Sequence, residues 1–373
     1  MPIAAILASM AASNIAHAQV TVTNLHPAGS LSSGANATAN GLQGGISTGH
    51  AGIWSGTAAS WVDLHPTVAI NTAISSTING MSNGQQVGSV TLTDAFGEQT
   101  AFHAALWSGT AASYVDLSPV SSIHPDNTSA ALAVHNGQQV GYTRFGSTEN
   151  AALWSGTAAS LVNLQPTGTG ILTSQALGVF NGQQVGYVHR GGNAGSAALW
   201  SGTANSLVEL NPAGAVSSSA YGIHNGQQAG SVSVNVGVQV REHASIWTGT
   251  AASWVDIHPA AATESRALAV HDGKQVGFAT IGTVTHASLW TGTADSWVDL
   301  STYLTGSWGD TQAKSIWSDD SSIYISGTGF NLSTNRQEAL LWVVPVPEPG
   351  SILLASLGGV LAVARWRRFQ SAK

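Results

Sequence analysis

Short apolar segments alternate with polar, glycine-containing turns along most of the chain, and residues 131–164 show the pattern clearly. An apolar segment runs into Asn136-Gly137, and a second apolar segment follows directly. Asn-Gly is the strongest signal of a two-residue hairpin, because both turn positions need a positive φ. A third apolar segment ends at Trp154, and a polar turn leads into a fourth at residues 161–164. We therefore expect four short strands in this unit.

The same unit recurs along the chain. A Trp that opens a W-[ST]-G-T-A motif returns in steps of 43 to 53 residues, at Trp54, Trp107, Trp154, Trp200, Trp247 and Trp290. A segment similar to Val-Asp-Leu follows each Trp, and Asn-Gly-Gln-Gln-Val-Gly or a close variant lies between the copies. Four strands in a unit of about 40 to 50 residues are typical of a propeller blade, whereas solenoid units are usually shorter and sandwiches longer.

Degenerate copies at both ends indicate the number of blades. The Asn40-Gly41 turn adds a first hairpin, and residues 339–342 add a seventh third strand. No fourth strand follows that copy, but residues 22–28 are similar to the fourth strand of the other copies. We expect the N-terminal strand to complete the last blade and close the ring, which removes exposed sheet edges. The prediction is all-β: one seven-bladed β-propeller over residues 19–344.

The first 18 residues are typical of a secretory signal peptide. Residues 3–12 form an apolar stretch, and Ala16 and Ala18 give an A-x-A cleavage pattern before Gln19. The positively charged segment that usually comes first is missing. A buried N-terminal helix is the alternative interpretation. We predict a signal peptide over residues 1–18 and export of the chain.

Residues 345–373 have the pattern of a membrane anchor. Residues 351–364 carry no charge. Arginines follow directly, at Arg365, Arg367 and Arg368. A helix from Pro349 to Trp366 would be about 27 Å long, close to the roughly 30 Å hydrocarbon core of a bilayer. Because arginines favour the cytoplasmic side, we predict a single C-terminal transmembrane helix with the bulk of the chain outside. A buried core helix is the alternative.

The tail resembles a PEP-CTERM sorting signal. The tripeptide Pro347-Glu348-Pro349, the short apolar segment and the terminal arginines carry this resemblance. It implies processing by an exosortase, a membrane transpeptidase-like enzyme of Gram-negative bacteria that make exopolysaccharide. The tail would then be a transient anchor, and the mature protein would be released, or attached at the cell surface or in its matrix.

The repeats resemble the HAF-type extracellular repeat of exported bacterial proteins. The elements A-x-x-x-N-G-Q-x-V-G and H-A-x-L-W carry this resemblance over residues 20–343. The W-S-G-T turn departs from it, because the HAF repeat often has a shorter turn there. This resemblance implies export and a repeated fold, and it implies no activity.

Composition supports an exported β-rich protein and excludes several classes of site. Charged residues make up 8% of the chain, against about 25% in an ordinary soluble protein. The chain has no Cys, which excludes disulfides and thiolate metal sites. Four of the 11 basic residues follow residue 364, so 7 basic residues face 18 acidic ones, a net charge of −11 before the tail. A nucleic-acid partner requires the opposite sign and is excluded.

Aromatic residues recur at two positions of the unit. The Trp of the W-[ST]-G-T-A motif could be a platform for sugar rings, but its repetition in every copy favours packing between blades. The fourth strand carries aromatic residues of varying size, at Trp61, Tyr114, Trp254 and Trp297. We consider this second set the better place for contacts with exopolysaccharide.

Histidine and aspartate also recur at fixed positions. One His series lies four residues before the Trp, at His50, His103, His243 and His286. A second series lies just before the hairpin turn, at His135, His224 and His271. Rings of His could bind a metal, but equivalent positions in different blades are usually too far apart unless they face the channel. We expect hydrogen bonding at strand ends instead.

The fourth strand carries a recurring acidic residue, at Asp63, Asp116, Asp256 and Asp299, with Asn163 and Glu209 in other copies. An acid that tolerates replacement by Asn is typical of a hydrogen-bond acceptor in a turn. No calcium-loop motif is present. We therefore predict neither a metal nor a cofactor.

No non-repeating group of residues has the pattern of a catalytic site. We predict an exported cell-surface or matrix protein with a binding or structural role, and not an enzyme. The alternative is a propeller-type polysaccharide lyase or hydrolase that acts on matrix glycan, because propellers can assemble a site from several blades. A protein-binding platform is a third possibility, and it would show as an exposed apolar patch.

Overall fold

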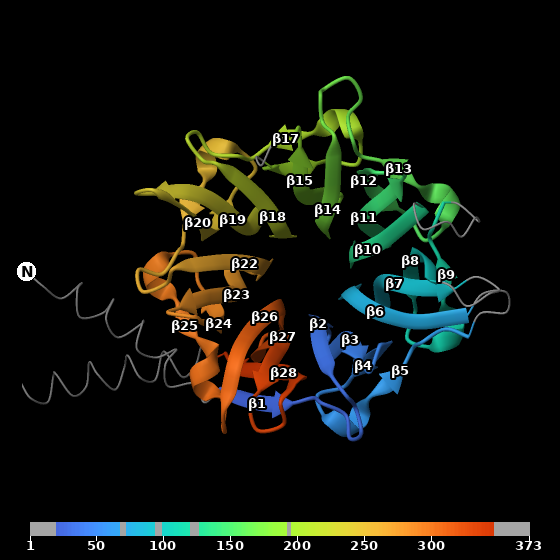
Figure 1. Ribbon diagram of the computed structural model, residues 1–373, viewed down its shortest axis with the longest axis vertical. Helices are drawn as coiled ribbons and strands as arrows, with labels where there is room; N and C mark the ends of the chain where they lie inside the picture. The colour runs from blue at the N-terminus through green and yellow to red at the C-terminus, as the bar shows by residue number, and fades with distance from the viewer. Residues whose placement is uncertain (1–19, 68–71, 94–98, 120–126, 192–194, 347–373) are drawn as a thin grey trace, which may run out of the picture.

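A computed structural model describes residues 20–67, 72–93, 99–119, 127–191 and 195–346. Within these residues the chain forms seven four-stranded antiparallel sheets arranged as blades around a central axis (Figure 1). The predicted all-β, seven-bladed propeller is confirmed. The predicted signal peptide, with Ala16 and Ala18, and the sorting tail from Pro347 onward lie outside the described residues.

The first four blades run from the innermost strand outward. Blade 1 contains β2 (Ser33–Ala39), β3 (Leu42–Ser47), β4 (His50–Trp54) and β5 (Val62–Asp63). Blade 2 contains β6 (Thr72–Ser82), β7 (Gln85–Thr93), β8 (Gln99–Trp107) and β9 (Val115–Asp116). Blade 3 contains β10 (Asn127–His135), β11 (Gln138–Phe145), β12 (Thr148–Trp154) and β13 (Val162–Asn163). Blade 4 contains β14 (Thr173–Phe180), β15 (Gln183–His189), β16 (Gly195–Trp200) and β17 (Val208–Glu209).

The remaining blades follow the same order until the last. Blade 5 contains β18 (Ser217–His224), β19 (Gln227–Val236), β20 (Gln239–Trp247) and β21 (Val255–Asp256). Blade 6 contains β22 (Glu264–His271), β23 (Lys274–Ile281), β24 (Val284–Trp290) and β25 (Val298–Asp299). Blade 7 contains β26 (Trp308–Ser318), β27 (Ser322–Asn331), β28 (Arg336–Pro345) and β1 (Thr21–Asn24).

Short 3-10 turns join the third and fourth strands of the first six blades. They are η1 (Ala58–Ser60), η2 (Ala111–Ser113), η3 (Ala158–Ser160), η4 (Ala204–Ser206), η5 (Ala251–Ser253) and η6 (Ala294–Ser296). A further one, η7 (Leu300–Tyr303), follows β25. No helix among the described residues is long and apolar enough to cross a membrane.

The N-terminal strand closes the ring. β1 pairs with β28, with Val22 opposite Trp342 and Asn24 opposite Leu340. In Figure 1 the blue β1 accordingly lies against the red-orange sheet of blade 7. The predicted completion of the last blade by the N-terminal strand is confirmed, so each of the seven blades has four strands.

The recurring Trp forms the core between blades. All seven copies, including Trp342, are completely buried. Each packs in a cluster that draws on two neighbouring blades: Trp154 of blade 3, for example, lies with Val87 and Leu106 of blade 2. The interpretation of this Trp as core rather than as a sugar platform is confirmed.

A hydrogen bond joins each blade to the next at the same place. A backbone N–H of the third strand donates to a buried hydroxyl on the innermost strand of the following blade, at 2.9 Å in all seven cases. The last of these bonds runs from Ala339 N–H to Ser33 Oγ and joins blade 7 to blade 1. The seven interfaces are therefore equivalent.

The second Gln of the Asn-Gly-Gln-Gln motif, or the Gln at its place, has a structural role in each of the first six blades. In blade 3, Gln139 is completely buried. Its Nε2 donates to the Gly137 carbonyl at 2.9 Å, and its Oε1 accepts from Gly156 N–H at 2.7 Å. This side chain therefore connects the inner hairpin turn to the W-S-G-T turn, which explains why the two motifs recur together.

Candidate ligand site in the central channel

The innermost strands enclose a cavity on the axis of the ring. It has a volume of about 320 Å³ and is lined by residues from the innermost strand of all seven blades. Each of these strands has a register shift at the same point, where a single residue has no partner on the neighbouring strand, and β6 and β26 have a second shift nearer their start. Such β-bulges re-aim side chains, and all seven bulge residues line the cavity: Asn36, Asn79, Leu132, Leu177, Tyr221, Leu268 and Lys314.

The bulge residues divide the wall of the channel into two arcs. Blades 7, 1 and 2 supply the polar side chains of Lys314, Asn36 and Asn79, whereas blades 3 to 6 supply three leucines and Tyr221. Lys314 Nζ donates to Asn36 Oδ1 at 2.9 Å. Asn36 Nδ2 and Asn79 Nδ2 donate to backbone carbonyls of the next blade, at 2.9 and 3.1 Å. The polar arc is therefore held in place by bonds between blades.

Apart from His, Lys314 is the only ionisable basic residue among the described residues that line this cavity. None of these lining residues is Asp or Glu. Burial lowers the pKa of Lys314 below its usual value. Its ammonium group has an amide oxygen for a neighbour, and an anion in the channel would stabilise the charged form. Sequence reasoning did not single out Lys314, although it is the one Lys at a position that carries Leu in three other copies.

One mouth of the channel is bordered by a row of stacked rings. His135, Phe180, His224 and His271 come from the last positions of four successive innermost strands. Neighbouring ring centroids lie 4.3, 4.3 and 4.2 Å apart along this row. The expected strand-end hydrogen bonds are present, since His135 Nε2 lies 3.1 Å from Asn181 Oδ1 and His271 Nδ1 lies 3.1 Å from Ser318 Oγ.

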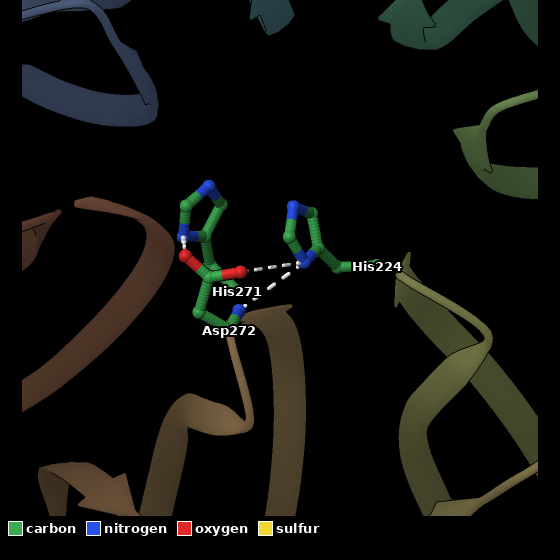
Figure 2. A group of neighbouring side chains, drawn as sticks. All are labelled: His224, His271 and Asp272. Atoms are coloured by element: carbon green, nitrogen blue, oxygen red, sulfur yellow. Dashed lines mark hydrogen bonds and ion pairs between the residues drawn. The ribbon is translucent and has the colours of Figure 1, made fainter. Parts of the chain in front are cut away.

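His224 and His271 project from neighbouring blades into the space enclosed by the ring, with Asp272 beside them (Figure 2). Nδ1 of each imidazole lies 3.5 Å from an oxygen of Asp272, and the backbone N–H of Asp272 donates to His224 Nδ1 at 3.2 Å. Burial lowers the pKa of His224 to about 4; the imidazole of His271 acts in the same direction and the Asp272 carboxylate opposes both. The His series before the hairpin turn thus faces the channel. As expected for residues that face the channel, two members of the series lie close together.

The other His series pairs with the recurring Asp of the fourth strand. Nδ1 of His50, His103, His243 and His286 lies 2.7, 2.7, 2.8 and 2.9 Å from a carboxylate oxygen of Asp63, Asp116, Asp256 and Asp299. The second oxygen of each Asp accepts a backbone N–H two residues further on. Hydrogen bonding by both series is confirmed, and these four pairs lie in separate blades.

The fourth-strand aromatics lie half-buried against their own blades. The rings of Trp61 and Trp54 are 4.4 Å apart, and those of Tyr114 and Trp107 are 5.8 Å apart. Trp254 Nε1 donates to Ser245 Oγ at 2.9 Å. Trp297 Nε1 makes the equivalent bond to Ser288 Oγ at 2.9 Å. Contacts of this set with sugars stay a prediction.

A family model described as PEP-CTERM protein-sorting motif matches residues 345–368. This match covers the tail that the sequence pattern delimits, including Pro347, Glu348 and Pro349 and the arginine cluster. It marks the chain as an exported protein that is transiently anchored in the membrane and is processed by an exosortase. The resemblance to HAF repeats stays a prediction. A search of curated proteins finds no match.

Solved structures with a similar fold include a hydrolase, the β-propeller domain of a protease and a peptidase. A puromycin hydrolase mutant complexed with PGG has 12% sequence identity and a TM-score of 0.50, over 80% of this chain and 50% of that one. The β-propeller domain of the Trilobed protease from Pyrococcus furiosus has 9% identity and a TM-score of 0.50, over 85% and 98%. An acylaminoacyl peptidase from Pyrococcus horikoshii has 10% identity and a TM-score of 0.50, over 87% and 54%.

This chain thus spans about half the length of the puromycin hydrolase. At these identities the likeness shows the propeller fold alone. The Trilobed protease domain is described as having an open velcro topology, whereas here β1 closes the last blade.

Proposed function

We propose that this chain is a surface-displayed binding protein of the exopolysaccharide matrix, and that its channel holds an acidic unit of a matrix glycan. The sorting motif supports the setting, because it directs the protein to the outside of the cell. The propeller supports binding, because a closed ring offers a rigid cavity that draws on every blade. The mature protein would lie at the cell surface or in the surrounding matrix.

The two-sided channel wall is the observation that carries this proposal. A sugar ring has apolar C–H faces and polar edges, so it matches a cavity with leucines on one arc and amides on the other. A carboxylate on that sugar would meet the Lys314 ammonium group, whose one side-chain partner among the described residues is the Asn36 amide. A neutral sugar would leave this cation without a counter-ion.

Binding rather than glycoside hydrolysis fits the described lining of the channel. Hydrolysis of glycosides commonly requires two carboxylic acids on either side of the scissile bond. The described lining residues include Lys, Tyr and His but neither Asp nor Glu. A lyase or hydrolase that acts on the matrix glycan is the competing function, and it is distinguished by turnover of the polymer.

The test measures binding of the full chain to uronate-containing and neutral oligosaccharides. Lys314→Leu places in blade 7 the residue that blades 3, 4 and 6 carry at the same position, so the fold accommodates it. Loss of a charge-assisted hydrogen bond should weaken binding of the acidic oligosaccharide by about tenfold or more and leave neutral ones unchanged. Lys274→Gln is the matched control, because it removes a charge outside the channel lining and restores the usual residue of the repeat.

Equal affinity of both variants for the acidic oligosaccharide would refute the role of Lys314. Depolymerisation of any matrix polysaccharide by the wild-type chain would refute a binding-only function.

A further inference from the structure

The hairpin turn between β22 and β23 departs from the repeat in charge. Five inner hairpins begin their turn with Asn, at Asn40, Asn83, Asn136, Asn181 and Asn225. Blade 6 has Asp272 there, with a φ of 45° that matches the 46 to 50° of the five Asn residues. Both Asn and Asp tolerate this left-handed conformation. The turn therefore does not require a carboxylate at residue 272.

The same place is where two neighbouring innermost strands both end in His. The equivalent positions of blades 1, 2 and 4 carry Ala39, Ser82 and Phe180. Among the ends of the innermost strands, only those of blades 5 and 6 place two imidazoles side by side, with ring centroids 4.2 Å apart, next to this extra carboxylate. Two departures from the repeat thus coincide at one point of the channel mouth.

The separations of these groups suit one bound ion. His224 Nδ1 and His271 Nδ1 each lie 3.5 Å from a different oxygen of Asp272. One ligand atom from each of the three residues can be chosen so that all lie within 4.8 Å of one another. Nitrogen and oxygen ligands at 2.0 to 2.2 Å from a tetrahedral ion are about 3.4 Å apart. The carboxylate therefore already has a ligand-like separation from both imidazoles.

We propose that His224, His271 and Asp272 form a binding site for a divalent transition-metal ion, with Zn²⁺ as the reference ion. Imidazole and carboxylate ligands suit this class of ion. Three protein ligands would leave a coordination position for water or for a group of a ligand in the channel, since both His line the cavity. Coordination through His224 Nδ1 would replace the 3.2 Å hydrogen bond from the Asp272 N–H.

The two other stacked His pairs among the described residues each contain an imidazole with both nitrogens hydrogen-bonded, His65 and His258. His243 and His258 also stack, at 3.9 Å, beside Asp256. There the Asp is bonded to His243 Nδ1, and both nitrogens of His258 bind Ser265 Oγ and the Ala262 carbonyl. At the channel mouth, no hydrogen bond joins Nε2 of His224 or His271 to a described residue, and in Figure 2 these nitrogens point away from the blades. A metal between these residues would replace one hydrogen bond at each Nδ1, from the Asp272 N–H to His224 and between His271 and Ser318 Oγ, and would leave each Nε2 free.

The test is Zn²⁺ binding by the full chain without a His tag, measured by equilibrium dialysis, with Co²⁺ absorption bands as a report of the ligand set. His224→Phe introduces the residue that blade 4 carries, and Asp272→Asn introduces the residue of the other turns. Each should weaken Zn²⁺ binding by more than the roughly tenfold that even an outer-shell partner contributes. His135→Phe removes an equivalent His with no neighbouring carboxylate, and it should bind Zn²⁺ like the wild type.

Three outcomes would overturn the site: no binding of Zn²⁺ by the wild type at micromolar concentration, equal loss in His135→Phe, or no loss in the two cluster variants. Thermal unfolding of each variant identifies any that fail to fold. The metal site does not depend on the glycan proposal. Lys314→Leu should retain Zn²⁺, so each proposal can fail without the other.

Discussion

A half-buried imidazole links neighbouring blades at the exit of the fourth strand. His258 Nδ1 lies 2.7 Å from Ser265 Oγ, and its Nε2 lies 3.1 Å from the Ala262 carbonyl. A carbonyl only accepts, so Nε2 carries the proton and Nδ1 accepts from the Ser hydroxyl. After the fourth strand of blade 3 this place holds the neutral Gln165, whose Oε1 accepts from Ser174 Oγ at 2.8 Å. The bond network therefore requires a neutral side chain.

We predict that His258 makes stability depend on pH. Burial lowers the pKa of His258 below 6.5; His243 and Arg241 act in the same direction, and the Ala262 carbonyl and Asp256 oppose them. The unfolded chain therefore binds more protons just below pH 6.5, so stability falls as pH falls through that window. Melting temperature measured from pH 7.5 to 5 should fall less in His258→Gln than in the wild type. The reverse variant, Gln165→His, should fall more; parallel curves for all three proteins would contradict this role.

At the scale of elements, the short β1 strand contributes more than its four residues suggest. Leu25, directly after β1, is completely buried, and its N–H donates to the Ala339 carbonyl at 2.8 Å. It packs with Trp54 of blade 1 and with Leu341 of blade 7. The closing strand thus adds a side chain to the interface between the first and last blades.

Leu25→Ala should therefore destabilise the protein by about 2–5 kcal/mol, through lost burial and the cavity left behind. Leu31→Ala is the matched control, because Leu31 is 77% exposed, and surface changes of this kind usually stay within about 0.5 kcal/mol. Denaturant unfolding measures both. Similar midpoints for the two variants would show that the closing segment contributes little to the ring.

At the scale of the whole molecule, the end of the propeller and the start of the sorting motif lie within a few residues of each other. β28 ends at Pro345, and the matched sorting motif begins at residue 345. Val346 N–H still donates to the Ser321 carbonyl at 2.8 Å. Cleavage at or after Pro347-Glu348-Pro349 would therefore leave all 28 described strands in the released part.

Replacement of Pro347-Glu348-Pro349 by three alanines should block processing. In cells with the exosortase, the wild-type chain should mature to a form that lacks the tail, while the variant should stay in the membrane fraction at its precursor mass. Mass spectrometry of both fractions measures this. The wild-type chain in a strain without exosortase is the control, and it should behave like the variant. Normal maturation of the variant would contradict dependence on the tripeptide.

The sequence by itself determined the seven blades, their hairpins, the closing strand and the Trp core. These follow from features within one unit, namely the Asn-Gly turns, the alternation of apolar segments and the repetition of both. It also delimited the sorting tail, whose three parts are contiguous. Each of these patterns lies within a short stretch of sequence, so it can be interpreted without knowledge of distant contacts. For the blades, the repeated copies of the unit support the same interpretation.

Only the tertiary structure decided what the channel contains. A β-bulge arises from the pairing register of two strands, so nothing in the sequence near Lys314 or Leu132 announces that these side chains face the axis. Likewise His224 and Asp272 are 48 residues apart, and they meet because the packing of blade 5 against blade 6 brings their equivalent turns together. The repeated sequence determines the strands of each blade. The arrangement of the blades around the axis determines which residues that differ from the repeat, such as His224 and Asp272, become neighbours.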